Sequence, residues 1–142
     1  MTETHLKILL LEDNPADADF LQALMLRSGR FPVDGLQWQI THVEELSVAL
    51  QQIQIHLSNG CFDAVLSDLS LPDAFGLDVI TQIHRLAPDL PIVVLTGLDD
   101  EAVGLEAMRR GAQDYLVKGR IDYSLLSRAI RYAIERSQTQ QV

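Results

Sequence analysis

The feature that most constrains the fold is a regular alternation of short apolar runs, typical of buried strands, with longer runs of helical periodicity. The apolar runs predict five strands, at 6–11, 36–42, 64–67, 91–95 and 114–117. Each strand precedes a predicted helix, at 14–27, 44–57, 74–86, 99–111 and 123–138. Because no block of consecutive strands occurs, the pattern predicts an α/β protein with a parallel sheet covered by helices on both faces.

The length limits how this alternation can close. The chain has 142 residues, of which 47% are apolar, enough for one domain with a buried core. A closed eight-stranded barrel needs about 250 residues and is excluded. We therefore predict one domain over 1–142, a flavodoxin-like, doubly wound (βα)5 sandwich of three layers. Its core covers about 6–136, with frayed tails at 1–5 and 138–142.

Composition excludes several classes of protein. No uncharged apolar stretch approaches the ~18–20 residues of a membrane span, and no basic segment precedes the first apolar run, as in a secretory signal. A single cysteine, Cys61, fits a reducing compartment. The net charge of −9 argues against a protein that coats nucleic acid. These features predict a cytoplasmic protein that binds neither membrane nor nucleic acid directly.

The charges are unevenly distributed. Residues 1–70 hold ten acids and three bases, whereas residues 71–142 hold ten acids and eight bases. Seven of these bases lie between Arg109 and Arg136. This segment is either a solvated face with cations at helix ends or a surface for a partner, and the sequence leaves both interpretations open.

Acidic residues follow two of the predicted strands. Glu12 and Asp13 come after the first strand, and Asp68 after the third. In a flavodoxin-like sheet these strands flank the switch point where ligands bind. Two carboxylates about 4 Å apart repel by about 4 kcal/mol at an effective dielectric constant near 20, so a cation between them is expected. The all-oxygen donor set suits Mg²⁺.

The other strand ends at this edge supply complementary groups. Thr96 ends the fourth strand and Lys118 follows the fifth, while Gly97 leaves room for a ligand to approach the backbone. A carboxylate nucleophile, a divalent metal, an ammonium and a hydroxyl together suit phosphoryl transfer. In this interpretation Asp68 attacks, and Lys118 and the metal offset the charge of the phosphoryl oxygens.

Four segments, LLLEDN, VLSDLSLPD, VVLTG and DYLVKG, resemble the chemotaxis-like receiver domain of two-component response regulators, over about 6–136. The resemblance implies the strand order 2-1-3-4-5 and makes Asp68 the phosphoacceptor. It implies that Mg²⁺ is held by Glu12, Asp13 and Asp68. It further implies that the phosphoryl group is contacted by Thr96, Gly97 and Lys118, with Asp68 and Lys118 as the catalytic pair.

The resemblance also implies partners and a switch. A sensor histidine kinase or a histidine phosphotransfer protein would supply the phosphoryl group. Thr96 and Tyr115 would then reorient, and the surface of the fourth helix, fifth strand and last helix would control an output partner. That surface is also a candidate homodimer contact. Such a domain catalyses only its own phosphorylation and dephosphorylation and is not an enzyme acting on an external substrate.

Some positions depart from the usual receiver pattern. Gly119 follows Lys118, where receivers commonly have proline after a cis peptide bond.

Two alternatives stay open beside the receiver switch. A Mg²⁺-dependent aspartyl phosphatase would need a second acid two residues after the nucleophile, where Ser70 stands. A binding module that signals without phosphate would be expected to have lost Asp68, one of the acids or Lys118, and all are present.

Overall fold

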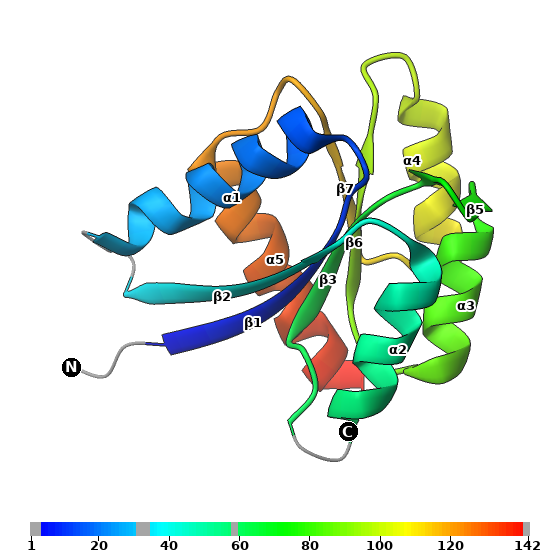
Figure 1. The fold of residues 1–142 in the computed structure, drawn as a ribbon, viewed down its shortest axis with the longest axis horizontal. Coiled ribbons are helices and arrows are strands. Elements are labelled where there is room, and N and C mark those ends of the chain that lie inside the picture. Colours follow the sequence, from blue (N-terminus) through cyan, green and yellow to red (C-terminus); the bar gives the residue numbers. More distant parts are fainter. Residues whose placement is uncertain (1–3, 31–34, 58–59, 141–142) are drawn as a thin grey trace.

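Five parallel strands form one sheet in the computed structural model, which describes residues 4–30, 35–57 and 60–140 (Figure 1). The strands are β1 (Thr4–Leu11), β2 (Leu36–Val43), β3 (Ala64–Asp68), β6 (Ile92–Thr96) and β7 (Asp114–Val117). Their order is β2-β1-β3-β6-β7, which confirms the predicted order 2-1-3-4-5. All five strands therefore end at the same edge of the sheet.

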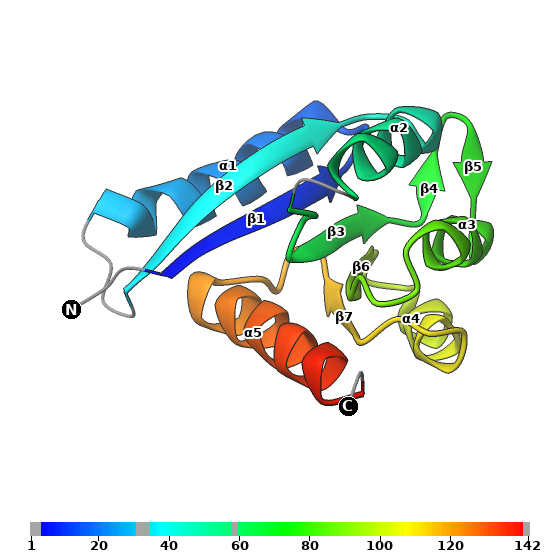
Figure 2. The same ribbon diagram turned by 90° about the horizontal axis from the view of Figure 1, so that it is seen from below.

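Helices cover both faces of the sheet (Figure 2). They are α1 (Pro15–Arg30), α2 (Leu46–His56), α3 (Asp78–Leu86), α4 (Glu101–Arg109) and α5 (Tyr123–Gln140). Helices α1 and α5 share one apolar cluster with the sheet, and α2, α3 and α4 share the other. The three layers confirm the predicted sandwich.

The central strand β1 explains why its sequence is almost continuously apolar. Side chains of a strand alternate between the two faces of the sheet. Leu9 and Leu11 pack in the cluster with α2, α3 and α4, and Ile8 and Leu10 pack in the cluster with α1 and α5. All four side chains are fully buried, as expected for a parallel strand with helices on both faces.

Helix α1 begins where the sequence predicts but extends further. The Asn14 side chain accepts a hydrogen bond from the backbone N–H of Asp17 (3.1 Å), and Pro15 occupies the first helical position. The helix was predicted to end near Arg27, with Gly29 as its C-cap. Instead it continues to Arg30, since one glycine inside a helix costs only about 1 kcal/mol.

The prediction of a helix over 74–86 is wrong at its start. A two-stranded antiparallel hairpin, β4 (Ser70–Leu71) with β5 (Ala74–Phe75), precedes α3. Gly76 has φ +70° and donates its N–H to the carbonyl of Leu69 (2.7 Å), which turns the chain out of the hairpin. Helix α3 therefore begins only at Asp78.

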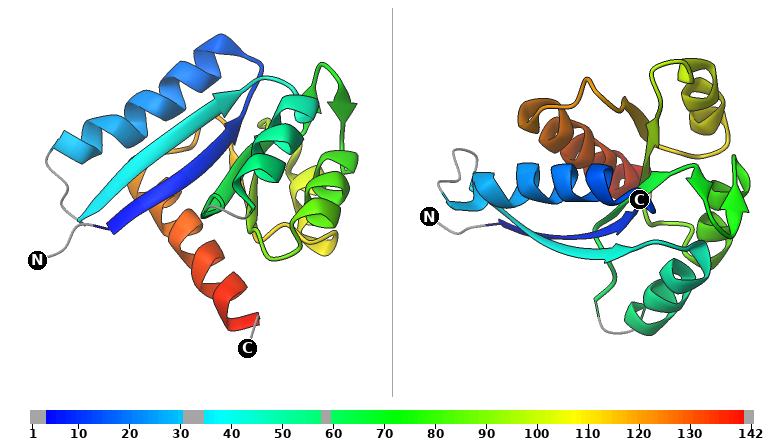
Figure 3. Two further views of the ribbon diagram at one scale, coloured as in Figure 1. Left: turned by 60° about the horizontal axis from the view of Figure 1, so that its bottom comes forward. Right: turned by 45° about the horizontal axis from the view of Figure 1, so that its top comes forward.

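Strands β1 and β2 are longer than the rest of the sheet (Figure 3). They pair over eight residues each, whereas β1 pairs with β3 only from Ile8 onward. Trp38 of β2 lies 6.3 Å from the Tyr123 ring in an edge-on arrangement and donates its indole N–H to the Tyr123 hydroxyl (3.1 Å). This contact fixes the start of α5 against the sheet.

Both ends of the ordered core extend slightly beyond the predicted limits. Strand β1 includes Thr4 and His5, which were placed in the first tail, and α5 continues to Gln140 past the predicted end near 138. Residues 1–3 and 141–142 of the predicted tails lie outside the described residues. Across the described part of the chain, no helix combines the length and apolar character needed to cross a bilayer.

Candidate functional site

Three carboxylates meet at the carboxyl edge of the sheet. Leu11 of β1 pairs with Ser67 of β3, so the residues that follow these two lie side by side. One carboxylate oxygen from each of Glu12, Asp13 and Asp68 lies within 4.8 Å of the others. Glu12 is fully buried, Asp68 is half-buried and Asp13 is exposed. The structure thus brings together the acids that the sequence singled out.

Lys118, after β7, reaches into this acidic cluster. Its Nζ atom lies 2.7 Å from Glu12 Oε1, 2.8 Å from Asp68 Oδ2 and 3.0 Å from Asp17 Oδ2. Burial alone would lower the pKa of Lys118, but its bonds to Asp68, Glu12 and Asp17 outweigh burial and raise that pKa above its usual value. Lys118 is therefore a fixed cation at the site.

Glu12 carries the most perturbed carboxyl group. Burial raises the pKa of Glu12 from 4.5 to about 7, against the opposing effect of Lys118. Two buried side-chain oxygens among the described residues lack a hydrogen bond, Glu12 Oε1 and Thr96 Oγ1. Glu12 Oε1 has only its ion-pair contact with Lys118. Buried polar atoms without a partner are rare in native proteins, so the Thr96 hydroxyl is the unusual group of the two.

The three carboxylates, of which Glu12 is buried, form an oxygen donor set that fits a magnesium ion. Mg²⁺ prefers oxygen donors and keeps part of its water shell, which one or two carboxylates complete. Asp13, the exposed member of the cluster, is the acid with most access to solvent. The donor chemistry of the three acids agrees with this ion.

A cavity of about 460 Å³ opens beside Asp68. Thr96 and Gly97, at the end of β6, line it together with Asp68. Two of the three predicted phosphate-contacting residues, Thr96 and Gly97, thus line this cavity, and the Thr96 hydroxyl is buried without a hydrogen bond. The third, Lys118, contacts Asp68 but is not among the residues that line the cavity. A Cβ added at Gly97 would lie 3.2 Å from the Asp100 carboxylate, so a larger residue at position 97 would crowd the Asp100 side chain.

The peptide bond between Lys118 and Gly119 is not cis. The backbone N–H of Lys118 bonds to the carbonyl of Thr96 (2.8 Å), which places it at the edge of the sheet. Gly119 follows with φ +90°, and no peptide bond among the described residues is cis. A proline cannot adopt this φ, so glycine here turns the chain by a different backbone route.

Tyr115, on β7, is half-buried and packs against α4. A Cβ added at Gly104 of α4 would lie 2.6 Å from Cδ2 of the Tyr115 ring, closer than any real side chain approaches. Gly104 therefore provides the space in which the tyrosine ring lies. The predicted switch tyrosine is in contact with the fourth helix of the main alternation.

Asp17 is the site residue that sequence reasoning missed. It lies in the first turn of α1 and contacts Lys118. A signal was available, because Asp17 follows Asp13 by four residues, about one helical turn, at an edge already rich in acids. Its contact with Lys118 depends on how α1 packs against the sheet, which no sequence pattern predicts.

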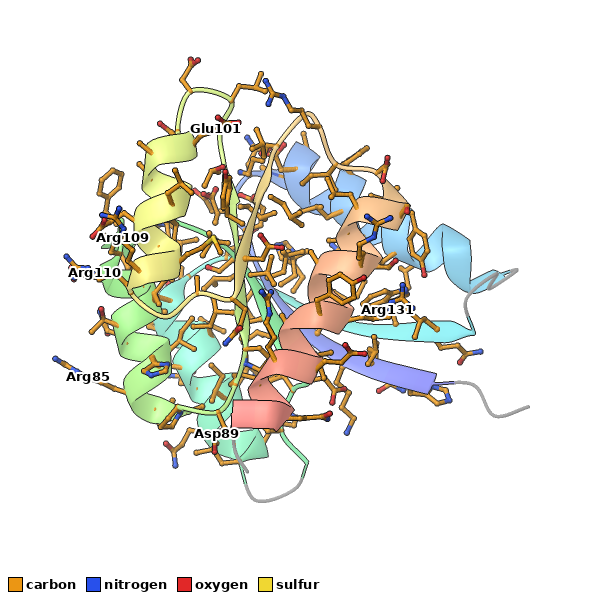
Figure 4. All side chains as sticks on the ribbon, turned by 180° about the vertical axis from the view of Figure 1, so that it is seen from behind. Arg85, Asp89, Glu101, Arg109, Arg110 and Arg131 are labelled. Atoms are coloured by element: carbon orange, nitrogen blue, oxygen red, sulfur yellow. The ribbon has the colours of Figure 1, made fainter. Side chains whose placement is uncertain are left out.

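The basic segment of the last third does not gather in one place. Figure 4 shows Arg109 and Arg110 projecting from the end of α4, and Arg131 projecting from α5 on the other side of β7. Arg109 and Arg110 both pair with Glu106, at 3.5 Å. Such exposed pairs contribute little free energy.

The comparisons identify the family. The model of the response regulator receiver domain matches residues 8–131, so the chain belongs to this family. Receiver domains are regulatory domains of two-component systems, and they bind Mg²⁺ in the active site. This chain has an acidic cluster at the carboxyl edge of its sheet, formed by Glu12, Asp13 and Asp68.

Solved structures and curated relatives agree with this assignment. A receiver domain protein from Clostridium thermocellum is 26% identical, with a TM-score of 0.76 over 95% of this chain and 98% of that one. The receiver domain of the sensor histidine kinase PA1611 from Pseudomonas aeruginosa, with magnesium coordinated in its active site cleft, is 27% identical, with a TM-score of 0.72 over 93% of this chain and 99% of that one.

The transcriptional regulatory protein ZraR from Escherichia coli is 26% identical over 94% of this chain, which covers 27% of ZraR. The chain spans about a quarter or less of the length of the curated relatives it matches. The functions of those whole proteins therefore do not transfer to this chain directly.

Proposed function

We propose that this chain is a phosphorylation-controlled switch whose phosphoacceptor is Asp68. The observation that carries the proposal is the position of the Asp68 carboxylate, which lies 2.8 Å from the Lys118 ammonium and belongs to the cluster with Glu12 and Asp13. A carboxylate so placed is half-buried, faces a cavity and has a fixed cation beside it. An aspartate carboxylate can act as the nucleophile in phosphoryl transfer, and a cation beside it can offset the charge of the phosphoryl oxygens.

The phosphoryl group would come from a phosphohistidine. An Asp68 oxygen forms the new P–O bond while the P–N bond to the donor imidazole breaks, and the imidazole keeps the electron pair. Lys118 faces the phosphoryl oxygens, and Thr96 Oγ1 donates a hydrogen bond to one of them. Mg²⁺, held by Glu12, Asp13 and Asp68, would offset the negative charge that accumulates at the site.

The switch follows from the new hydrogen bond. Thr96 Oγ1 has no partner in the structure, so a phosphoryl oxygen on Asp68 would give it one. Movement of Thr96 would change the end of β6, where Thr96 pairs with Val117 of β7, two residues after Tyr115. The ring of Tyr115 lies against Gly104, so its reorientation would alter the surface formed by α4, β7 and α5.

The mass of the intact protein tests the chemistry. The protein is incubated with Mg²⁺ and acetyl phosphate, with an EDTA control. We expect one added phosphoryl group on the wild type and none on Asp68→Asn. Asp73→Asn is the matched control, because Asp73 lies in the same loop outside the site, and it should be modified like the wild type.

Rapid hydrolysis would hide the adduct, so beryllofluoride binding is measured on the same samples. Loss of both signals in a folded wild type would contradict the proposal and favour the binding module that signals without phosphate. Turnover of external phosphomonoesters would favour the aspartyl phosphatase. Ser70 stands where that enzyme needs an acid, and it lies exposed on β4.

The partners remain predictions. We expect a sensor histidine kinase or a histidine phosphotransfer protein as the donor, and an output partner or a second copy of the chain on the α4–β7–α5 surface. The same holds for a cytoplasmic location, for the absence of direct nucleic-acid binding and for the assignment of all 142 residues to one domain.

A further inference from the structure

The Lys118 ammonium has a third partner outside the predicted site. An ammonium carries three N–H donors, and the contacts with Glu12, Asp68 and Asp17 occupy all three. Asp17 contacts Lys118 at 3.0 Å from the first turn of α1. It is not a member of the oxygen cluster suited to a metal ion, which contains Glu12, Asp13 and Asp68.

The start of α1 holds Asp17 in place. Asn14 accepts the Asp17 backbone N–H through its side-chain oxygen (3.1 Å). The backbone N–H of Asn14 in turn donates to Glu12 Oε2 (3.2 Å). Asp17 is therefore fixed to the same turn of chain that carries the buried Glu12. Its side chain is 39% exposed, whereas the Lys118 side chain is only 22% exposed, so Asp17 approaches the ammonium from the solvent side.

The three carboxylates on Lys118 differ in what phosphorylation demands of them. Asp68 would carry the phosphoryl group, and Glu12 belongs to the cluster that would hold Mg²⁺. For Lys118 to donate to a phosphoryl oxygen, at least one of its present bonds must break. Asp17 is the partner that neither event removes.

We propose that Asp17 is a positioning residue that anchors Lys118 while a bond to Glu12 or Asp68 is exchanged for a bond to the phosphoryl group. The inference rests on the proposed function. Without this anchor, the ammonium would pair more closely with Glu12 and Asp68, against Mg²⁺ and against its turn toward phosphate. Asp17 thus acts through Lys118 and touches neither the metal site nor the phosphoryl group.

The chain is well suited to a direct test, because it contains only two lysines, Lys7 and Lys118. With ¹⁵N-labelled lysine, NMR reports two side-chain ammonium signals. Lys7 is exposed and serves as the internal reference. In the wild type we expect the Lys118 signal to stay sharp and shifted from that of Lys7, both without ligand and with Mg²⁺ and beryllofluoride.

Three variants separate the anchor from other effects of a charge on α1. Asp17→Asn removes the carboxylate, and Asp17→Glu keeps it. Asp19→Asn removes an exposed carboxylate from the same helix and controls for net charge. We expect phosphorylation by acetyl phosphate at saturating Mg²⁺ to slow about tenfold in Asp17→Asn, as for other residues that orient a catalytic group. Asp17→Glu should restore most of the rate, and Asp19→Asn should leave it unchanged.

The NMR signal decides whether the effect passes through Lys118. In Asp17→Asn we expect the Lys118 signal with Mg²⁺ and beryllofluoride to broaden and move toward that of Lys7. A wild-type rate together with an unchanged Lys118 signal would overturn the anchor. An equal loss of rate in Asp19→Asn would also overturn it, since net charge would then be the cause.

The two proposals fail in different ways. If the wild type neither gains a phosphoryl group nor binds beryllofluoride, the phosphorylation switch fails and the anchor fails with it. If the wild type is phosphorylated and Asp17→Asn behaves identically in rate and in NMR signal, only the anchor fails.

Discussion

Asp68 and Asp73 stand five residues apart in the segment that ends β3 and forms the hairpin, yet their carboxylates are held in opposite ways. Asp68 shares the Lys118 ammonium with other carboxylates. Asp73 accepts two backbone N–H groups at the start of α2, from Leu46 (2.8 Å) and Ser47 (2.9 Å). One carboxylate lies where negative charge is in excess, and the other closes a helix end whose donors need an acceptor.

The difference separates a chemical role from a structural one. Burial tends to raise the pKa of Asp73, but the bonds from Ser47 and Leu46 outweigh it and lower that pKa. At the site, four carboxylates and one ammonium give a formal charge of −3 when all are ionised (Glu12, Asp13, Asp17, Asp68 and Lys118). Uncompensated charge of this kind favours a bound cation.

Removing the Lys118 ammonium should give the largest effect, because Glu12, Asp17 and Asp68 share this cation. In Lys118→Met the carboxylates lose their shared cation, and the phosphoryl oxygens lose a charged donor. We expect phosphorylation by acetyl phosphate to slow about 100- to 1,000-fold, the usual cost of losing such a donor. Intact mass against time measures the rate.

Mg²⁺ affinity distinguishes this loss from unfolding. With its competitor gone, Mg²⁺ should bind Lys118→Met more tightly than the wild type, which calorimetric titration measures. Weaker Mg²⁺ binding in the folded variant would mean that Lys118 organises the acids instead of competing for them.

Glu12 gives the next largest effect, through pH. Its pKa is raised from 4.5 to about 7 in the folded protein, so the folded protein binds this proton more tightly than the unfolded chain does. The free energy of unfolding should therefore fall as pH rises from 4.5 to about 7, and the full penalty remains above that range. Glu12→Gln should remove a penalty of at most about 3–4 kcal/mol, at about 1.4 kcal/mol per pKa unit.

Urea denaturation in EDTA between pH 4 and pH 8 measures this difference. Glu12→Gln should exceed the wild type in stability at pH 8, and the two should converge near pH 4. A gap that does not change with pH would show that the carboxyl is not the titrating group. Adding Mg²⁺ at pH 8 should stabilise the wild type more than the variant.

The strand ends explain how much of the site was predictable. In a parallel sheet all carboxyl ends lie at one edge, so Glu12, Asp68, Thr96 and Lys118 could be placed together from their positions after apolar runs alone. The alternation of apolar runs with segments of helical periodicity indicated the order of strands and helices along the chain. The reach of Asp17 to Lys118 was not predictable, because it depends on the packing of α1.

The hairpin shows where local signals mislead. Pro72 and Asp73 are typical of a helix start, and the sequence interpretation placed them before the helix that follows. Asp73 does cap a helix, but the helix is α2, whose first residue precedes it by 27 positions. A capping residue indicates that some helix end lies near, and only the tertiary structure states which one.

The smallest effect comes from Asp73, whose carboxylate has a structural role. Asp73→Ala leaves two N–H groups of α2 without their acceptor, so we expect it to lower the free energy of unfolding by about 1–2 kcal/mol, as for other lost helix caps. Because Asp73 balances only local donors, the rate of phosphorylation should stay at the wild-type value. Urea denaturation and the acetyl phosphate reaction measure the two quantities, with Asp19→Ala as the control for loss of an exposed acid. A slowed reaction in a stable Asp73→Ala protein would mean that the hairpin positions Asp68, and the two aspartates would then belong to one site.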